Sequence, residues 1–184
     1  MKGIISILLL IFVSLTLHSQ GKYYTEKGFA RFFSVAPLEN IEATNDELKA
    51  VINLANGELL FVLPVQSFVF EKDLMRRHFN EQYLETNLFP EARFIGKIVD
   101  FNPIISFYEV SRVVTVRGEL TIHGVTRKIT EQATLQYSQT RLLGESKFKV
   151  KVKDYDIKIP RLLVRNIAEV VEVTLKVDLE KAEP

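Results

Sequence analysis

Alternation of apolar and polar residues is the feature that most constrains the fold of this chain. It is clearest in residues 170–179, where Val and Leu occupy every second position and charged residues or Thr stand between them. Residues 112–122 and 146–153 show the same pattern. Because successive side chains of a strand point to opposite faces, the pattern predicts strands with one buried face. The spacing along the chain predicts roughly eight to nine antiparallel strands.

The first half of the chain is expected to follow the same plan. Asn56-Gly57 separates two apolar runs, residues 48–54 and 58–65, which is a strong signal for a β-hairpin. Residues 28–35 are predicted to form a strand with Phe29, Phe33 and Val35 on one face. Residues 37–47 are polar and rich in turn-forming residues, and are therefore predicted to form a loop.

One stretch differs from the strands. Near residues 71–87, Met75, Phe79 and Tyr83 recur four positions apart, and Pro90 follows. This spacing predicts a short helix with one apolar stripe, ending before the proline. Because a helix this short is not stable alone, it is expected to dock on the strands as a plug. The predicted fold is mainly all-β, an antiparallel eight-stranded β-barrel with a short helical plug.

Charge and cysteine content exclude several functions. The 184 residues carry 24 Lys and Arg against 23 Asp and Glu, so the chain offers no basic field for nucleic acid. The lysines at 147, 149, 151 and 153 occupy alternate positions and are interpreted as a solvated strand face. Cysteine is absent, which excludes thiolate catalysis and thiolate metal sites.

The N-terminus has the layout of a secretory signal. Lys2 precedes an apolar run, residues 4–17, and small and polar residues follow it. We expect a signal peptide at residues 1–19, cleaved after Ser19, and one barrel domain at residues 20–184. Cleavage would leave no stable membrane anchor and would place the protein in the periplasm or outside the cell.

Several spaced motifs resemble the YceI-like family, also called the bacterial polyisoprenoid-binding family. The segment LMRRHFNEQYLETNLFPEARF matches its Met-x-x-His-Phe and Pro-x-x-x-Phe pattern through Met75, His78, Phe79, Pro90 and Phe94. GELTIHGVTRKIT, residues 118–130, is similar to its Gly-x-Leu-Thr-x-His-Gly-Val-Thr turn, and DYDI, residues 154–157, provides a third match. The chain departs from the family at Arg127-Lys128, where Lys-Pro is common, and at Glu131, where an apolar residue is usual.

The resemblance implies a lipocalin-like barrel with an internal tunnel, a periplasmic location and a bound isoprenoid or quinone-like lipid. No other cofactor and no metal are expected. The sequence is compatible with either a monomer or a homodimer. The inward positions and the plug give the candidate ligand-binding residues, which are Phe33, Phe61, Met75, His78, Phe79, Tyr83, Phe94, Val114, Val116, Leu120, Leu135, Phe148, Val150, Val173 and Leu175.

Five polar residues have two interpretations each. His78 is either a structural residue or a ligand contact, and His123 is expected to have a structural role in a turn, the alternative being a chemical role. Arg76 and Arg77 are expected to be solvated, although arginine would suit a ligand phosphate. Glu131 is predicted to face inward with Ile129 and Ala133, either at a barrel end reaching water or toward a polar group of the ligand.

We expect a binding protein and not an enzyme, and no catalytic residue is assigned. The sequence has neither a Gly-x-Ser-x-Gly nor a His-Glu-x-x-His motif. The main hypothesis is an exported lipid-binding protein that holds a long apolar chain inside the barrel, for transport, storage or sequestration. The alternative is a structural or stress-response envelope protein whose barrel is filled by its own side chains.

Overall fold

Strands make up most of the described chain. The computed structural model describes residues 21–35, 40–99, 101, 110–137, 140–158 and 169–182. Its eight long strands are β1 (Lys22–Ser34), β2 (Ile41–Asn53), β3 (Glu58–Pro64), β5 (Glu91–Ile98), β6 (Arg112–Ile122), β7 (Val125–Tyr137), β8 (Arg141–Lys151) and β9 (Val170–Lys181). A two-residue strand, β4 (Val69–Phe70), pairs only with β2 among the described elements.

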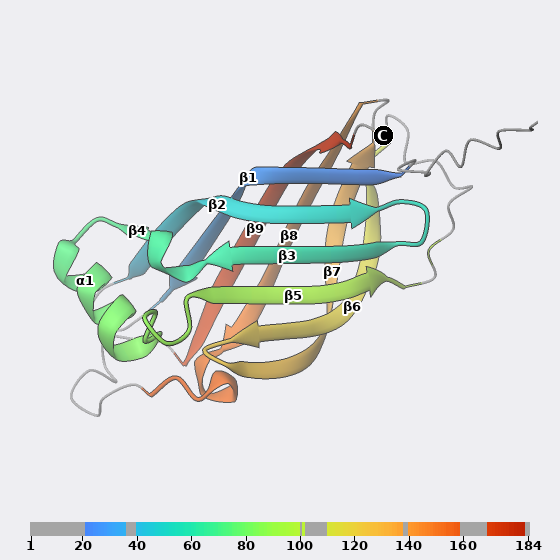
Figure 1. The fold of residues 1–184 in the computed structure, drawn as a ribbon. Coiled ribbons are helices and arrows are strands. Elements are labelled where there is room, and N and C mark those ends of the chain that lie inside the picture. Colours follow the sequence, from blue (N-terminus) through green and yellow to red (C-terminus); the bar gives the residue numbers. More distant parts are fainter. Residues whose placement is uncertain are drawn as a thin grey trace, which may run out of the picture.

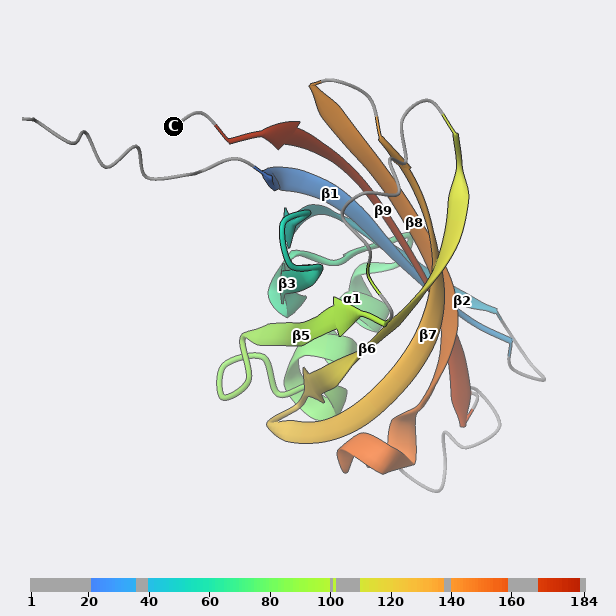
Figure 2. The same cartoon turned by 90° about the vertical axis from the view of Figure 1, so that its right-hand side faces the viewer.

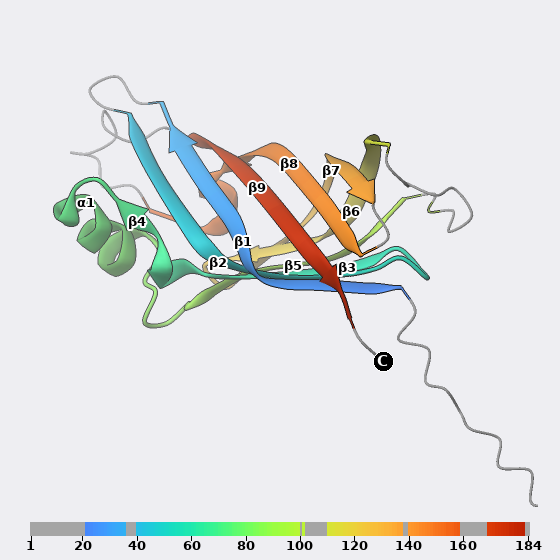
Figure 3. The same ribbon diagram turned by 90° about the horizontal axis from the view of Figure 1, so that it is seen from above.

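The eight long strands close into an antiparallel barrel. Each pairs with its neighbour in the order β1-β2-β3-β5-β6-β7-β8-β9, and β9 pairs back onto β1. In Figure 1, β1, β2, β3 and β5 form the front wall, and β9, β8 and β7 cross behind them. Figure 3 shows β2, β1, β9 and β8 side by side from above. The predicted eight-stranded barrel is therefore confirmed.

The two faces of the strands differ as the alternation predicts. On the β8–β9 pair, opposite charges meet across the strands on the outer face. The Arg141 guanidinium donates to both carboxylate oxygens of Asp178 at 2.6–2.7 Å, and Lys147 lies 2.8 Å from Glu172. Lys149 and Lys151 are exposed like Lys147, which agrees with a solvated face.

Helical residues lie at one end of the barrel (Figure 1). Helix α1 (Asp73–His78) continues directly into η2 (Phe79–Tyr83), which has π-helical geometry. Both fall inside the predicted plug at residues 71–87. Two short 3₁₀ segments, η1 (Val65–Ser67) and η3 (Val152–Tyr155), end β3 and β8. No helix among the described residues is long and apolar enough to cross a membrane.

The predicted loop at residues 37–47 is wrong for its second half, because β2 already begins at Ile41. Asn45 occupies an inward position of this strand and is 1% exposed. Its side-chain amide donates to the Pro64 carbonyl at 2.8 Å, and its side-chain oxygen accepts from the Glu47 backbone N–H at 2.8 Å. A buried polar residue with both groups bonded is stable in a strand but breaks the apolar alternation. Residues 37–39 and the proposed signal peptide lie outside the described residues.

The end of the barrel away from α1 is filled by side chains. Leu142 and Leu179, paired between β8 and β9, are fully buried. Tyr23 packs edge-on against Tyr137 with ring centroids 5.7 Å apart. Burial and the neighbouring Tyr137 raise the pKa of Tyr23. This closed end is a packed core, whereas the space at the α1 end is not filled.

Candidate ligand-binding cavity

A cavity of about 550 Å³ occupies the barrel at the α1 end. Seven of the long strands line it, together with α1, η2 and the segments that connect β3 to the helix. Its lining is almost wholly apolar, and this volume lies within the range of about 300–1,000 Å³ found for ligand pockets. The barrel interior described here is therefore not filled by its own side chains at this end.

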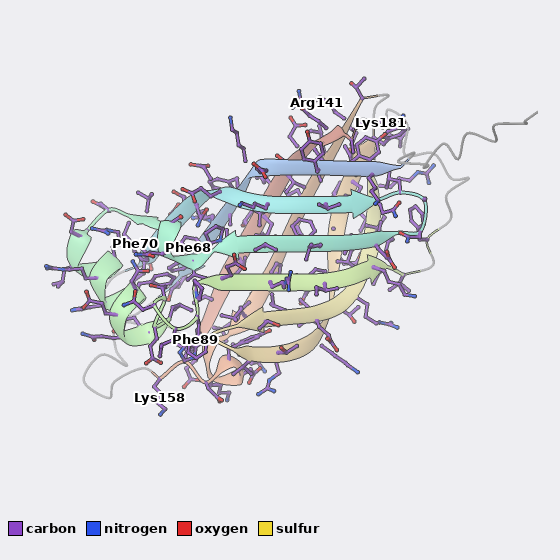
Figure 4. The ribbon with its side chains drawn as sticks, viewed as in Figure 1. Phe68, Phe70, Phe89, Arg141, Lys158 and Lys181 are labelled. Atoms are coloured by element: carbon purple, nitrogen blue, oxygen red, sulfur yellow. The ribbon has the colours of Figure 1, made fainter. Side chains whose placement is uncertain are left out.

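A cluster of aromatic rings fixes the helix over this end. Phe79 stacks on Phe32 of β1 with centroids 5.4 Å apart and planes 14° apart. It also contacts Phe68 and Phe70, at 5.6 and 5.0 Å. Figure 4 shows Phe68 and Phe70 beside the helical segment. These rings come from three separate parts of the chain, and Phe32 and Phe70 both lie opposite Ala43 of β2, so the helix docks on β1 and β4 once both have paired with β2.

Polar side chains of the cavity lining are few. Lys72 directly precedes α1, His78 is the last residue of α1, and Arg93 belongs to β5. Ser34 and Tyr83 supply hydroxyl groups, and burial raises the pKa of Tyr83. No carboxylate lines this cavity among the described residues. The site can therefore bury a long apolar group, with basic side chains near the helix.

Most of the predicted ligand-binding residues line this cavity. They are Phe61, Met75, His78, Phe79, Tyr83, Phe94, Leu120, Phe148, Val150, Val173 and Leu175. Val116 and Leu135 instead line a smaller cavity deeper in the barrel. Val114 packs against the core at the closed end.

Phe33 does not face the interior, so its predicted orientation is wrong. Its ring lies on the outer face, where the Arg31 guanidinium carbon is 4.9 Å from the ring centroid. The inward residues of this part of β1 are Ala30, Phe32 and Ser34. Ala30 and Ser34 are small, so the sequence pattern favoured burial of the face that carries the larger residues Phe29, Phe33 and Val35.

Several lining residues could not be predicted from the sequence. Phe32, Phe68 and Phe70 supply the aromatic wall that meets the helix. The signal was the apolar stripe of the helix, which required an apolar partner. The stripe did not identify that partner, since Phe32 lies on β1 and Phe68 and Phe70 lie in the segment between β3 and α1.

The smaller cavity, of about 80 Å³, contains a carboxyl group. Seven of the long strands line it, and β7 and β8, which border it, pair only over residues 133–137 of β7. Glu131 lines it from the middle of β7, opposite Val116 of β6. The predicted inward orientation of Glu131 is confirmed, and burial raises the pKa of its carboxyl group. Its position is not a strand end.

His123 connects three segments at the α1 end. Its Nε2 lies 2.9 Å from a carboxylate oxygen of Glu85, and its Nδ1 lies 3.2 Å from the Tyr155 carbonyl oxygen. The Phe89 ring packs edge-on against it at 4.5 Å. Both Glu85 and His123 have positive φ angles, 42° and 51°. These contacts support the structural role predicted for His123.

The remaining polar candidates are not gathered into a metal centre. Among the described residues, no three or more His, Asp and Glu side chains form a group that could hold a metal ion. Arg76 and Arg77 are exposed, and Arg76 lies 3.3 Å from the Asp73 carboxylate.

Comparison with known proteins gives one family. A family model described as YceI-like domain matches residues 25–179. No curated protein matches the chain.

Solved structures share the fold. A polyisoprenoid-binding domain from Saccharophagus degradans, implicated in plant cell wall breakdown, has a TM-score of 0.75 at 19% identity; the match covers 88% of this chain and 99% of that domain. BcnA of Burkholderia cenocepacia has a TM-score of 0.65 at 17% identity, covering 84% and 96%. The Campylobacter jejuni YCEI protein has a TM-score of 0.58 at 14% identity, covering 74% and 81%.

Proposed function

This chain belongs to the YceI-like domain family, and we propose that it is a lipid-binding protein that holds an isoprenoid or similar apolar chain inside its barrel. The observation that carries this proposal is the apolar cavity of about 550 Å³ at the α1 end of the barrel, whose opposite end is a packed core. The Saccharophagus domain, described as polyisoprenoid-binding, supports the choice of ligand class. The proposed activity is binding, for transport, storage or sequestration, without chemical turnover.

Burial of hydrocarbon accounts for the affinity. Each buried CH₂ group contributes about 0.8 kcal/mol, so a chain of about 20 carbons would gain roughly 16 kcal/mol before other costs. Association costs an estimated 4–15 kcal/mol in lost translational and rotational freedom. The polar head would remain near Lys72, His78 and Arg93, where water and basic side chains can solvate it. Binding therefore needs no polar contact along the hydrocarbon chain of the ligand.

We also propose that the protein works outside the cytoplasm. The support is the sequence of residues 1–19, which has the layout of a cleavable secretory signal. Fractionation of the producing cells, with N-terminal sequencing of the mature protein, tests this independently of ligand binding. A protein that stays cytoplasmic with Met1 intact would overturn it.

The ligand is tested by extracting protein purified from the producing cells with organic solvent. Mass spectrometry of the extract is expected to find a prenyl-chain lipid near one per protein. Titration of stripped protein with geranylgeraniol then measures the affinity directly. A clean extract together with no binding in the titration would favour the alternative of a structural envelope protein.

Two neighbouring positions of β3 provide a matched pair of variants. Leu63 lines the cavity, whereas Val62, the next residue, does not. Leu63→Asp should lower the affinity at least 100-fold, because an ionised carboxylate in an apolar cavity is strongly unfavourable. Val62→Asp should keep the affinity within about threefold. Equal losses in both variants would contradict binding inside the barrel.

A further inference from the structure

The main cavity and the smaller cavity are separated by one layer of side chains. Five residues line both cavities, and they come from β3, β5, β6, β8 and β9. They are Phe61, Phe94, Leu120, Phe148 and Leu175. This set, called the ring layer below, forms the floor of the main cavity. The smaller cavity continues beneath it toward the closed end.

Phe94 is the member of the ring layer whose position is most tightly specified. Gly96 and Gly118 face each other across β5 and β6. A Cβ atom added at either glycine would lie 2.7 Å from the Cζ atom of Phe94, closer than real side chains approach. The glycine pair therefore leaves space for the Phe94 ring to lie over the backbone. Phe61, opposite Phe94 on β3, completes the contact with ring centroids 6.5 Å apart.

The space beneath the ring layer does not suit hydrocarbon. It holds only about 80 Å³, and Glu131 faces it from β7. A hydrocarbon chain that entered would have to share an apolar chamber with a carboxyl group, which is unfavourable. The Phe94 ring and the Glu131 carboxyl group therefore both oppose entry of a longer hydrocarbon chain.

We propose that Phe94 sets the depth of the cavity and thereby the number of isoprene units that the barrel encloses. This inference rests on the proposed function and makes it more specific. A cavity of about 150 Å³ accommodates one benzene molecule, or roughly 25 Å³ per carbon. At that density the main cavity holds about 22 carbons, or about four isoprene units. The expected ligand is an amphiphile that buries about 20 carbons at its tail end, and in a longer ligand the carbons next to the polar head stay outside.

Removal of the ring should extend the cavity. Joining the two cavities adds about 80 Å³, and loss of the six-carbon ring adds a benzene-sized space of about 150 Å³. Together they would admit about nine more carbons, close to two isoprene units. The Glu131 carboxyl group would still oppose the last of these carbons.

The experiment measures affinity against chain length with prenyl alcohols of two to seven isoprene units. For the wild-type protein, affinity should rise roughly tenfold or more per unit up to about four units and then level off. Phe94→Ala should move this plateau to five or six units. The double variant Phe94→Ala/Glu131→Leu should move it furthest, and Glu131→Leu alone should leave it in place.

A matched control loses a different ring of the same cavity. Phe70 lines the main cavity near the helix but not the smaller one. Phe70→Ala should weaken binding of all lengths by a similar factor without moving the plateau. If Phe94→Ala is poorly folded, Phe94→Leu keeps an apolar side chain and should shift the plateau by about one unit.

The outcomes separate this inference from the proposed function. If no prenyl alcohol binds the wild-type protein, the proposed function fails and this inference fails with it. If the wild-type protein binds but a folded Phe94 variant keeps the wild-type plateau, only the inference is overturned. A wild-type affinity that keeps rising beyond five units would also overturn it.

Discussion

A carboxyl group inside an apolar barrel makes stability depend on pH. Burial raises the pKa of Glu131 above its ordinary value of 4.5. The folded protein therefore binds this proton more tightly than the unfolded chain does. The resulting stabilisation is complete below the ordinary pKa and is lost as the pH rises through the raised folded value. Glu131 therefore lowers stability at neutral pH relative to an uncharged side chain.

We predict that Glu131→Gln is more stable than the wild-type protein at pH 7 and loses this part of the pH dependence. Urea unfolding between pH 4 and pH 8 measures both effects. Glu119→Gln is the control, because Glu119 is exposed on the neighbouring strand β6 and lines neither cavity. An identical pH profile for the wild type and Glu131→Gln would contradict the buried position of the carboxyl group.

Single residues also show where sequence reasoning fails. The inward orientation of Glu131 follows from alternation along β7, and the structure agrees. Alternation fails for Phe33, because β1 buries the small residues Ala30 and Ser34 and leaves a phenylalanine outside. It also fails at Asn45, whose polarity is satisfied by the backbone at Pro64 and Glu47. In both cases the alternation alone does not identify the buried positions, and at Asn45 the missing information is the contact with Pro64 of β3.

At the scale of elements, the plug shows what local sequence does and does not determine. The apolar stripe of residues 71–87 predicts a helix that must dock, and α1 with η2 does so. The stripe cannot specify the π-helical geometry of η2 or the rings that receive it. Those rings belong to β1 and to the segment after β3, and the pairing of β1 and β4 with β2 brings them together.

We predict that Phe79→Ala detaches the helical segment while the barrel stays folded. Phe79 is partly buried, so the loss should be smaller than the 3–5 kcal/mol of a fully buried phenylalanine, and about 2 kcal/mol is expected. Because α1 and η2 are too short to be helical alone, their amides should lose protection. Hydrogen exchange of residues 73–83 should accelerate at least tenfold, with little change in β8 and β9.

Arg77→Ala is the control for this prediction, since Arg77 is exposed on the same helix. It should leave both the exchange rates and the free energy of unfolding nearly unchanged. Unchanged exchange in Phe79→Ala would show that the helix is held by other contacts, such as those of Leu84 in the same buried cluster.

At the scale of the whole molecule, the two ends of the barrel differ in whether side chains fill them. Figure 2 turns the barrel by 90° and shows β7 and β8 diverging from the end where they pair. The closed end is a filled core, whereas the α1 end contains the cavity. The sequence predicts a barrel, yet the cavity is invisible to alternation, because an inward side chain has the same pattern whether it faces a neighbour or empty space.

We therefore predict that stability and binding separate between the two ends. Leu142 is fully buried at the closed end and lines neither cavity, so Leu142→Ala should cost about 2–5 kcal/mol of unfolding free energy. Its affinity for geranylgeraniol, measured well below the melting temperature, should stay within about threefold of wild type, since no ligand contact is lost. Leu63→Ala, in the cavity wall, should behave oppositely: it should weaken binding about tenfold, because a bound chain loses apolar contacts there, and destabilise the ligand-free protein less. Comparable losses of affinity in the two variants would mean that the packed core positions the cavity walls, and that the ends do not act independently.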